Sequence, residues 1–330
     1  MKFMILEYFD IHNIIKFQLR NNNIAGFLKN TNPEYKYFTV DEHVDPDFRV
    51  TVSKTFNANR EEYGIKHAFK KRYPKWEVEI LEYENGFVDV TIIPYVNGVR
   101  KFFEYSALKN LYVRSLLYYC LIRKGCTLIH SSAVNIKDEA YVFIGRPGAF
   151  KTSIIMDLLR QPETSFLGEE NVLLSDEKIY PFPLNIHSLN HKIKYYKNED
   201  PPSVIHKLFL GLSLLKNKTI DIPISKPCKT RKIFFLEKKN KFECIKNNLE
   251  DLIDKLILNE VEEIDITPTH TFSGISNNCF SEYLHEIRTL DSLEEKLRNV
   301  FIKDISNVDM YSVSMPSSYE PGLISEFLKA

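Results

Sequence analysis

The feature that most constrains this chain is a nine-residue loop with two glycines, set between an apolar segment and a helical pattern. Residues 145–153 read GRPGAFKTS, residues 140–144 before them read AYVFI, and residues 153–161 read SIIMDLLRQ. The short apolar run predicts a strand, and the apolar residues three and four positions apart after the loop predict a helix. A strand, a glycine loop, Lys-Thr and a helix, in that order, are the setting in which a phosphate-binding loop folds.

Each residue type in this loop has a physical use in binding phosphate. Glycines let backbone N–H groups turn toward an anion, and the helix N-terminus adds unpaired N–H donors and the positive end of its dipole. Lys151 would supply positive charge to the β- and γ-phosphates, and the Thr152 hydroxyl would be a ligand for Mg²⁺. We therefore predict a site for ATP and Mg²⁺ made by Gly145, Arg146, Pro147, Gly148, Ala149, Phe150, Lys151, Thr152 and Ser153.

The loop departs from the full pattern G-x-x-x-x-G-K-[ST] at one position, because Phe150 replaces the second glycine. A residue other than glycine fits there if its φ is negative. We expect the Phe150 side chain to point away from the phosphates, onto the following helix or the adenine-side wall. The alternative interpretation of the loop is a plain strand-to-helix turn that carries a surface lysine.

Composition and charge exclude several classes of protein. Lys and Arg number 44, as do Asp and Glu, so the net charge does not favour a nucleic acid or a membrane surface as partner. The five cysteines have no paired spacing, which favours reduced thiols in a cytoplasmic protein. The N-terminus lacks a signal-peptide pattern. The apolar window 108–125 is broken by Lys109, Arg114 and Arg123, which predicts a buried helix and no membrane span.

The N-terminal third of the chain has mainly a β pattern. Alternating residues predict strands over 48–56, 76–83 and 87–96, with hairpin turns at 84–86 and at 97–98, the second leading to VRKFFEYS. Short helices are expected near 10–16 and 60–70.

The rest of the chain alternates between the two patterns. Helices are expected over 108–125, 153–160, 204–215, 248–259, 280–290, 293–301 and 322–330, and strands over 127–136, 140–144, 229–239 and 308–315. A further strand is expected to begin at 164 and to end at Glu169 and Glu170, with a hairpin after it. A turn at 137–139 makes the strand that enters the glycine loop the second arm of a hairpin. The charged segment 194–202 is expected to be a surface loop or a lid.

Three further residues have side chains suited to phosphoryl transfer. Glu169 and Glu170 follow the apolar residues SFLG, where one carboxylate could bind Mg²⁺ and the other could accept the proton of an attacking hydroxyl. His130 lies in LIHSSAV, close in sequence to the loop, and could bind the γ-phosphate or the carboxylates. The alternatives are a solvated turn for the two glutamates and a core residue for His130. His187 and His191 have the spacing of a helical metal pair, but their neighbours favour a loop.

The string LIHSSAVNIKDEAYVFIGRPGAFKTS, followed by FLGEENVLLSDEKIYPFP, resembles the core of HPr kinase/phosphorylase and related P-loop kinases. In that family a strand with L-H-x-x-x-V leads through a hairpin to G-x-S-G-x-G-K-[ST], and a later strand ends in paired aspartates. The family core is similar to that of phosphoenolpyruvate carboxykinase. The resemblance covers about residues 127 to 184.

The resemblance implies roles for individual residues. Lys151 and Thr152 take the phosphate and metal roles, His130 takes the place of the family histidine, and Glu169 and Glu170 stand for the paired aspartates. Phe150 and Pro147 depart from the family glycine and serine. No segment like E-V-R-G-L-G follows the core, so neither HPr as substrate nor the phosphorylase activity is implied.

Together these features predict an α/β protein with two domains. An N-terminal β-rich α+β domain over 1–105 precedes an HPr-kinase-like P-loop core with a mixed sheet over 106–330. The expected function is a kinase that transfers phosphate from Mg-ATP to a hydroxyl of a small molecule, an amino acid or a peptide. The alternative is a nucleotide-binding regulatory or assembly module without phosphoryl transfer. The expected partners are a nucleotide and this hydroxyl-bearing acceptor, and self-association into a homo-oligomer is left open.

Overall fold

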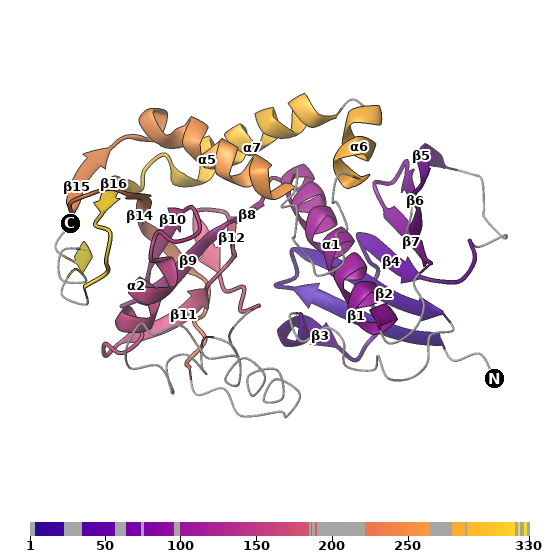
Figure 1. The fold of residues 1–330 in the computed structure, drawn as a ribbon, viewed down its shortest axis with the longest axis horizontal. Coiled ribbons are helices and arrows are strands. Elements are labelled where there is room, and N and C mark those ends of the chain that lie inside the picture. Colours follow the sequence, from indigo (N-terminus) through magenta and orange to yellow (C-terminus); the bar gives the residue numbers. More distant parts are fainter. Residues whose placement is uncertain are drawn as a thin grey trace. The chain divides into compact units, whose positions relative to one another are not determined.

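The computed structural model is an α/β protein with mixed sheets and few helices (Figure 1). The structure describes residues 4–22, 35–56, 64–73, 76–95, 100–184, 186, 189, 222–264, 279–287, 289–320, 323, 327 and 328. The chain divides into two compact units: residues 1–125 with 261–297, and residues 126–260 with 298–330. Within the described residues, no helix is both long and apolar enough to cross a bilayer.

The first unit is built on a seven-stranded sheet with the strand order β3-β1-β2-β4-β7-β6-β5. The β2–β4 and β4–β7 pairs are parallel, and the other neighbours are antiparallel. Helix α1 packs against β2, β4 and β7. The elements of this unit are β1 (Met4–Ile11), β2 (Ile15–Asn22), η2 (Lys36–Phe38), β3 (Thr39–Val40), β4 (Phe48–Val52), β5 (Ile65–Arg72), β6 (Trp76–Tyr83), β7 (Val88–Pro94), α1 (Arg100–Arg123) and α6 (Cys279–Glu286).

The second unit is built on a nine-stranded mixed sheet. Its main path is β11-β9-β10-β14-β13-β12-β8, and β16 pairs with both β14 and β15. The elements are β8 (Thr127–Ile129), β9 (Ser131–Ile136), β10 (Glu139–Gly145), α2 (Lys151–Leu158), β11 (Thr164–Gly168), β12 (Val172–Ser175), β13 (Lys178–Tyr180), β14 (Cys228–Lys238), β15 (Glu243–Asn247) and β16 (Asp309–Met315). Helices α5 (Leu249–Ile264) and α7 (Leu290–Ile305) each continue from one unit into the other.

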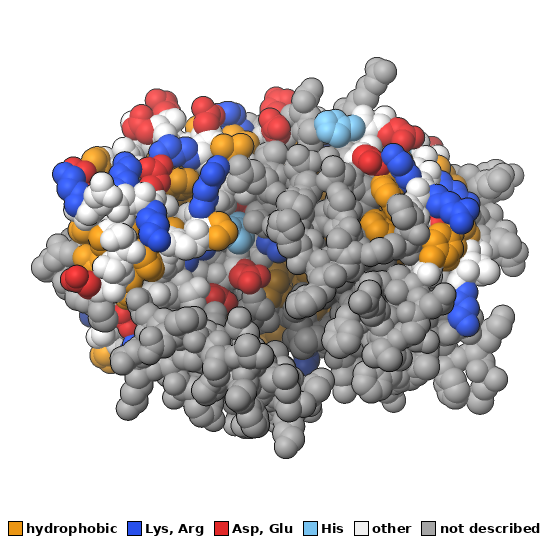
Figure 2. All heavy atoms as spheres, in the orientation of Figure 1, with side chains coloured by type: hydrophobic (Ala, Val, Ile, Leu, Met, Phe, Trp, Pro, Cys, Tyr) orange, Lys and Arg blue, Asp and Glu red, His pale blue; other side chains and the backbone are white. Residues whose placement is uncertain are grey.

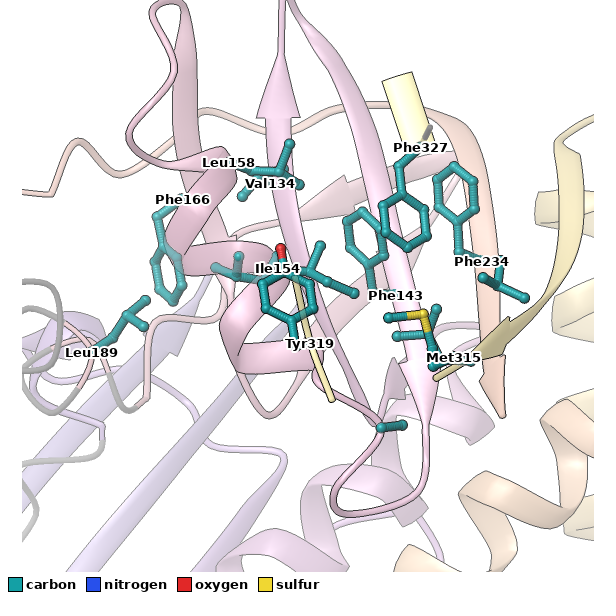
Figure 3. Close-up of a cluster of buried hydrophobic side chains, with 14 of the residues drawn as sticks. Val134, Phe143, Ile154, Leu158, Phe166, Leu189, Phe234, Met315, Tyr319 and Phe327 are labelled. Carbon is teal, nitrogen blue, oxygen red and sulfur yellow. The ribbon is translucent and has the colours of Figure 1, made fainter. Parts of the chain in front are cut away.

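A cluster of buried side chains fixes α2 against the sheet of the second unit (Figure 3). Ile154 and Leu158 of α2 are wholly buried or nearly so, and they pack with Phe143 of β10 and Phe234 of β14. The rings of Phe143 and Phe234 stack with their centroids 5.1 Å apart. Burial of large apolar side chains is the main stabilising term in such a core. The helix that follows the glycine loop is therefore held firmly by packing.

Most elements of the second unit agree with the sequence prediction. The β9–β10 hairpin, the helix after the loop and the strands at 228–238 and 309–315 are all present. One predicted strand, 127–136, is divided at His130 into β8 and β9, which pair with different neighbours. The strand expected to end at Glu169 and Glu170 does so as β11, and the hairpin expected after them is formed by β12 and β13. The predicted loop 194–202 and helix 204–215, and the pair His187 and His191, lie outside the described residues.

The N-terminal helices predicted from the sequence were wrong. Residues 10–16 contain a turn with positive φ at His12 and Asn13, which joins β1 to β2 in a hairpin. Residues 65–72 form β5, which lies at one edge of the first sheet. Its exposed lysines suit an edge because they oppose pairing with another chain, and they hide the apolar alternation that marks a strand. Residues 100–107, expected to follow a hairpin turn, belong to α1.

The two compact units do not contain the same residues as the two predicted domains. The sequence predicted a boundary near residues 104–126, with the N-terminal domain ending at residue 105, and the first break between the compact units lies after Gly125. Helix α1 therefore groups with the N-terminal strands, against which it packs. Acidic and basic side chains are interspersed over the described part of the face in Figure 2, in line with the equal numbers of the two charges.

A buried carboxylate organises polar side chains in the first unit. Glu82 of β6 is 1% exposed, and its Oε2 accepts hydrogen bonds from the hydroxyls of Tyr119 (3.0 Å) and Tyr283 (2.8 Å). Arg123 lies 3.0 Å from Oε1. Burial, together with the neighbouring negative charge of Glu82, raises the pKa of both tyrosines. The two hydroxyls therefore remain donors, and they connect α1 and α6 to the sheet.

Tyr283→Phe should lower the free energy of unfolding by about 1.5–3 kcal/mol, because it removes a buried hydrogen bond to a charged group. Thermal denaturation of the full chain checks this. The control is Tyr37→Phe, since the Tyr37 side chain is 49% exposed and its hydroxyl should contribute little. Equal melting temperatures for the wild type and Tyr283→Phe would contradict the proposed role of the cluster.

The second unit buries a carboxyl group near the end of α7. The Asp304 side chain has no exposed surface, and its Oδ1 lies 3.6 Å from Lys303 Nζ. Burial raises the pKa of Asp304 above the usual aspartate value, despite this lysine. A carboxyl group whose pKa is raised by folding is more easily kept protonated in the folded state. Ionisation of Asp304 inside the protein therefore lowers the stability of the fold as the pH rises.

Asp304→Asn should stabilise the protein at a pH where the wild-type carboxyl group is ionised, by about 1.4 kcal/mol for each unit by which folding raises its pKa, because the amide does not ionise. An unfolded aspartate titrates near about 3.9. The wild type should lose stability relative to the variant as the pH rises above that value, and the difference should level off above the raised pKa. Melting curves between about pH 3 and about pH 8 measure this difference. The exposed control Asp41→Asn should lack it, and a pH-independent difference for Asp304→Asn would refute the explanation.

Candidate functional site

The topology of the second sheet brings the predicted site residues to one edge. β10 and β14 are parallel, with Gly145 opposite Leu236, so their carboxyl ends meet there. β9 is antiparallel to β10 and begins at the same edge, with Ser131 opposite Ile144. β11 is antiparallel to β9 and therefore ends at that edge too. The glycine loop, the residue before β9 and the residues after β11 consequently lie close together.

The backbone of the loop requires its first glycine. A Cβ on Gly145 would lie 2.6 Å from the backbone oxygen of Leu236 and 3.2 Å from the Cβ of Ala149. Gly148 has φ +85, which L-residues with side chains rarely adopt, and Ala149 N–H donates to Arg146 O at 3.1 Å. The loop is thus a tight turn that presses against the end of β14.

The backbone conformation of Phe150 differs from the expectation, whereas the packing of its ring on the following helix agrees with it. Its φ is +65, so the prediction of a negative φ was wrong, and it occupies the left-handed region before the first turn of α2. Its ring is half-buried against the cluster that includes Ile154 of α2, with the Tyr319 ring 5.9 Å away. Lys238 Nζ lies 5.2 Å from the centre of the Phe150 ring. Packing of this ring stabilises a backbone conformation that glycine would adopt more easily.

Lys151 begins α2 and contacts two of the segments at this edge. Its ammonium donates a hydrogen bond to the backbone oxygen of Gly145 and lies 3.3 Å from His130 Nε2. An ammonium has only donors, so Nε2 acts as the acceptor in this contact. The predicted lysine and the predicted histidine are therefore direct neighbours.

Thr152 contacts the first of the two glutamates. Its hydroxyl donates to Glu169 Oε1 at 2.8 Å, and Glu169 is 8% exposed. The backbone of Glu169 is held as well, because the Ser132 hydroxyl donates to its carbonyl oxygen. The bend after β11 depends on Gly168, where a Cβ would collide with the backbone oxygen of Asn171.

The other residues of the predicted site lie around the Lys151–His130 and Thr152–Glu169 contacts. Glu170 is exposed, and its carbonyl oxygen accepts the Ser131 N–H at 3.1 Å. Arg146 and Pro147 are exposed at the tip of the loop, and Ser153 is half-buried in the first turn of α2. The two glutamates are thus distinguished by their surroundings: one is buried beside the threonine, and the other faces solvent.

Two residues of α5 that the sequence did not single out also belong to this neighbourhood. The backbone N–H of His130 donates to both carboxylate oxygens of Glu260, at 2.9 and 3.0 Å. Asn259 Nδ2 donates to Glu260 Oε1 at 2.8 Å and to the His130 carbonyl oxygen at 3.4 Å. Nothing local in the sequence predicts contacts across about 130 positions; the only sign was two polar residues at the end of an amphipathic helix.

The donor types present are compatible with a Mg²⁺–phosphate ligand. Mg²⁺ takes a hydroxyl, one or two carboxylates, water and phosphate oxygens, and Thr152, Glu169 and Glu170 offer the first two kinds. In the described part of the chain, no three His, Cys, Asp or Glu side chains gather into a metal site of their own.

Comparison with protein-family models finds no match, and no curated protein matches the sequence significantly. The interpretation of the site therefore rests on its geometry and on the chemistry of its side chains.

Gly145→Ala should destabilise the protein by about 1–3 kcal/mol, because the new methyl group overpacks the junction with β14. Gly148→Ala is the matched control: no atom lies within 4 Å of a Cβ there, and only backbone strain of about 1 kcal/mol is expected. Thermal melting compares the two variants. A Gly145→Ala protein as stable as Gly148→Ala would show that the close approach to Leu236 does not constrain the loop.

Proposed function

We propose that the second unit binds Mg-ATP at the loop 145–153 and transfers the γ-phosphate to a hydroxyl group of a small molecule, an amino acid or a peptide. One observation carries this proposal. Three separate segments contribute side chains that contact one another. Lys151 Nζ lies 3.3 Å from His130 Nε2, and the Thr152 hydroxyl lies 2.8 Å from Glu169 Oε1. A phosphotransferase of the HPr-kinase-like type would use a lysine, a hydroxyl, a histidine and a carboxylate, with Glu169 standing here in the place of an aspartate.

The roles follow from the chemistry of each group. Lys151 would neutralise charge on the transferred phosphate, and the N-terminus of α2 would add its dipole. Thr152 and Glu169 would hold the Mg²⁺, which supplies further charge neutralisation when bound. Glu170, exposed at the same edge, would accept the proton of the incoming hydroxyl. His130 would hold the phosphate through its ring.

A binding module without phosphoryl transfer is the second candidate. The contact of Thr152 with Glu169 favours it, because the two groups proposed as metal ligands form a hydrogen bond with each other in this arrangement. The left-handed Phe150 favours it too, since it places a bulky residue where the family has glycine. Turnover of ATP distinguishes the two candidates.

Lys151→Ala should weaken Mg-ATP binding at least about tenfold, equivalent to about 1.4 kcal/mol. Isothermal titration calorimetry on the full chain measures this. Lys229→Ala is the control, because Lys229 lies opposite Glu139 at the other end of the β10–β14 pair and forms an exposed ion pair with Glu177, its side chain being 74% exposed. Equal affinities for the wild type and Lys151→Ala would remove the loop from the nucleotide site.

Glu169→Gln should reduce the dependence of ATP affinity on Mg²⁺, whereas Glu170→Gln should leave affinity intact and lower turnover. The measurement is release of ADP by mass spectrometry, first with Mg-ATP alone and then with serine, sugars, inositol or cell-extract peptides added. A kinase should hydrolyse ATP slowly without an acceptor and transfer phosphate when the right one is present. Stable bound ATP throughout, with a melting temperature that rises with ATP concentration, would support the binding module.

A further inference from the structure

The residue between β8 and β9 is held by side chains of a helix that is distant in sequence. Strand β8 pairs with β12, whereas β9 pairs with β10 and β11, so the sheet ladder is interrupted at His130. Glu260 and Asn259 of α5 contact the backbone N–H and carbonyl groups of His130. They satisfy backbone groups that a continuous strand would satisfy by pairing.

We propose that Glu260 and Asn259 are positioning residues of the nucleotide site, acting through His130. This inference rests on the proposed function, because it assigns them a part in placing the His130 ring beside Lys151. Both residues contact the backbone of His130, so the inferred route to the site runs through that residue.

We call the contacts of Glu260 and Asn259 with the backbone of His130 the clamp, and burial makes it rigid. Glu260 has no exposed surface, and its two carboxylate oxygens converge on one N–H, while Asn259 bridges the carboxylate and the carbonyl group. Hydrogen bonds to a charged group are stronger than neutral ones, and more so where water is excluded. Loss of the carboxylate would leave the His130 N–H without this acceptor inside the protein.

The clamp acts on the backbone of His130 and leaves the ring able to exchange partners. In this structure the ring nitrogen Nε2 accepts from Lys151, which assigns the ring proton to Nδ1. An incoming phosphate would compete for the Lys151 ammonium. Because the backbone of His130 is fixed from α5, the ring would remain at the edge of the sheet when the lysine changes partner.

The ring proton of His130 gives a test that does not need a nucleotide. The full chain is labelled with ¹⁵N-histidine, and the His130 signal among the nine histidines is assigned with His130→Gln. The wild type should show Nδ1–H and unprotonated Nε2. Glu260→Ala should shift the signal toward the Nε2–H form, as should Lys151→Ala, whereas Glu260→Gln keeps an acceptor for the backbone N–H and should stay close to the wild type. An unchanged signal in folded Glu260→Ala overturns the proposal.

The second measurement is the rate of Mg-ATP turnover. Glu260→Ala should lower Mg-ATP turnover about tenfold or more, the usual effect of losing a residue that orients a site residue. Its effect should vanish in the His130→Ala background, because both changes would then remove the same function. Additive losses in the double variant would show that Glu260 does not act through His130.

The two measurements separate failure of this inference from failure of the proposed function. If the wild type binds no nucleotide, the proposed function fails, and the histidine spectrum still decides whether α5 positions the ring. If Glu260→Ala does not fold, Asn259→Ala serves in its place, since Asn259 is half-buried and its loss removes the bridge to the His130 carbonyl group. Asn259→Ala should give a smaller shift in the same direction, and no shift would count against the clamp.

Discussion

The pairing of β10 between β9 and β14 is the constraint on which the candidate site depends. An antiparallel neighbour on one side and a parallel neighbour on the other bring the start of one strand and the ends of two others to the same edge. Gly145 then lies so close to Leu236 that only glycine fits. The packing of α2 on this sheet keeps Lys151 and Thr152 at the edge. Without this strand order, the polar residues would be scattered over separate loops.

Polar contacts within the second unit cross long stretches of sequence. The route runs from Glu260 through the backbone of His130 to its ring, and then to Lys151. The first and last steps are hydrogen bonds between groups that are at least partly buried, where such bonds are strong, and the step between them is the covalent side chain of His130. The apolar cluster behind α2 and the polar contacts in front of it therefore hold the loop from two sides.

Local patterns predicted the elements that form the site but not how they connect. The loop, its hairpin and its helix could be predicted because strand alternation, turn residues and glycine act over a few residues. The positive φ of Phe150 could not, because the ring is held by Tyr319 and other residues far along the chain. His130 was predicted inside a strand, and the interruption there depends on Glu260. Strand β5 was predicted as a helix because its edge position leaves its lysines in solvent.

The two compact units are interleaved in the sequence, and this affects the order in which the protein can fold during synthesis. The first unit needs residues 261–297, which include Tyr283, a partner of Glu82. The ribosome makes residues 126–260 before that partner exists. The hydrogen bonds of the buried Glu82 carboxylate can therefore be completed only after most of the chain has been synthesised. A chain ended near residue 125 would lack Tyr283, and neither unit is a single continuous stretch of the sequence.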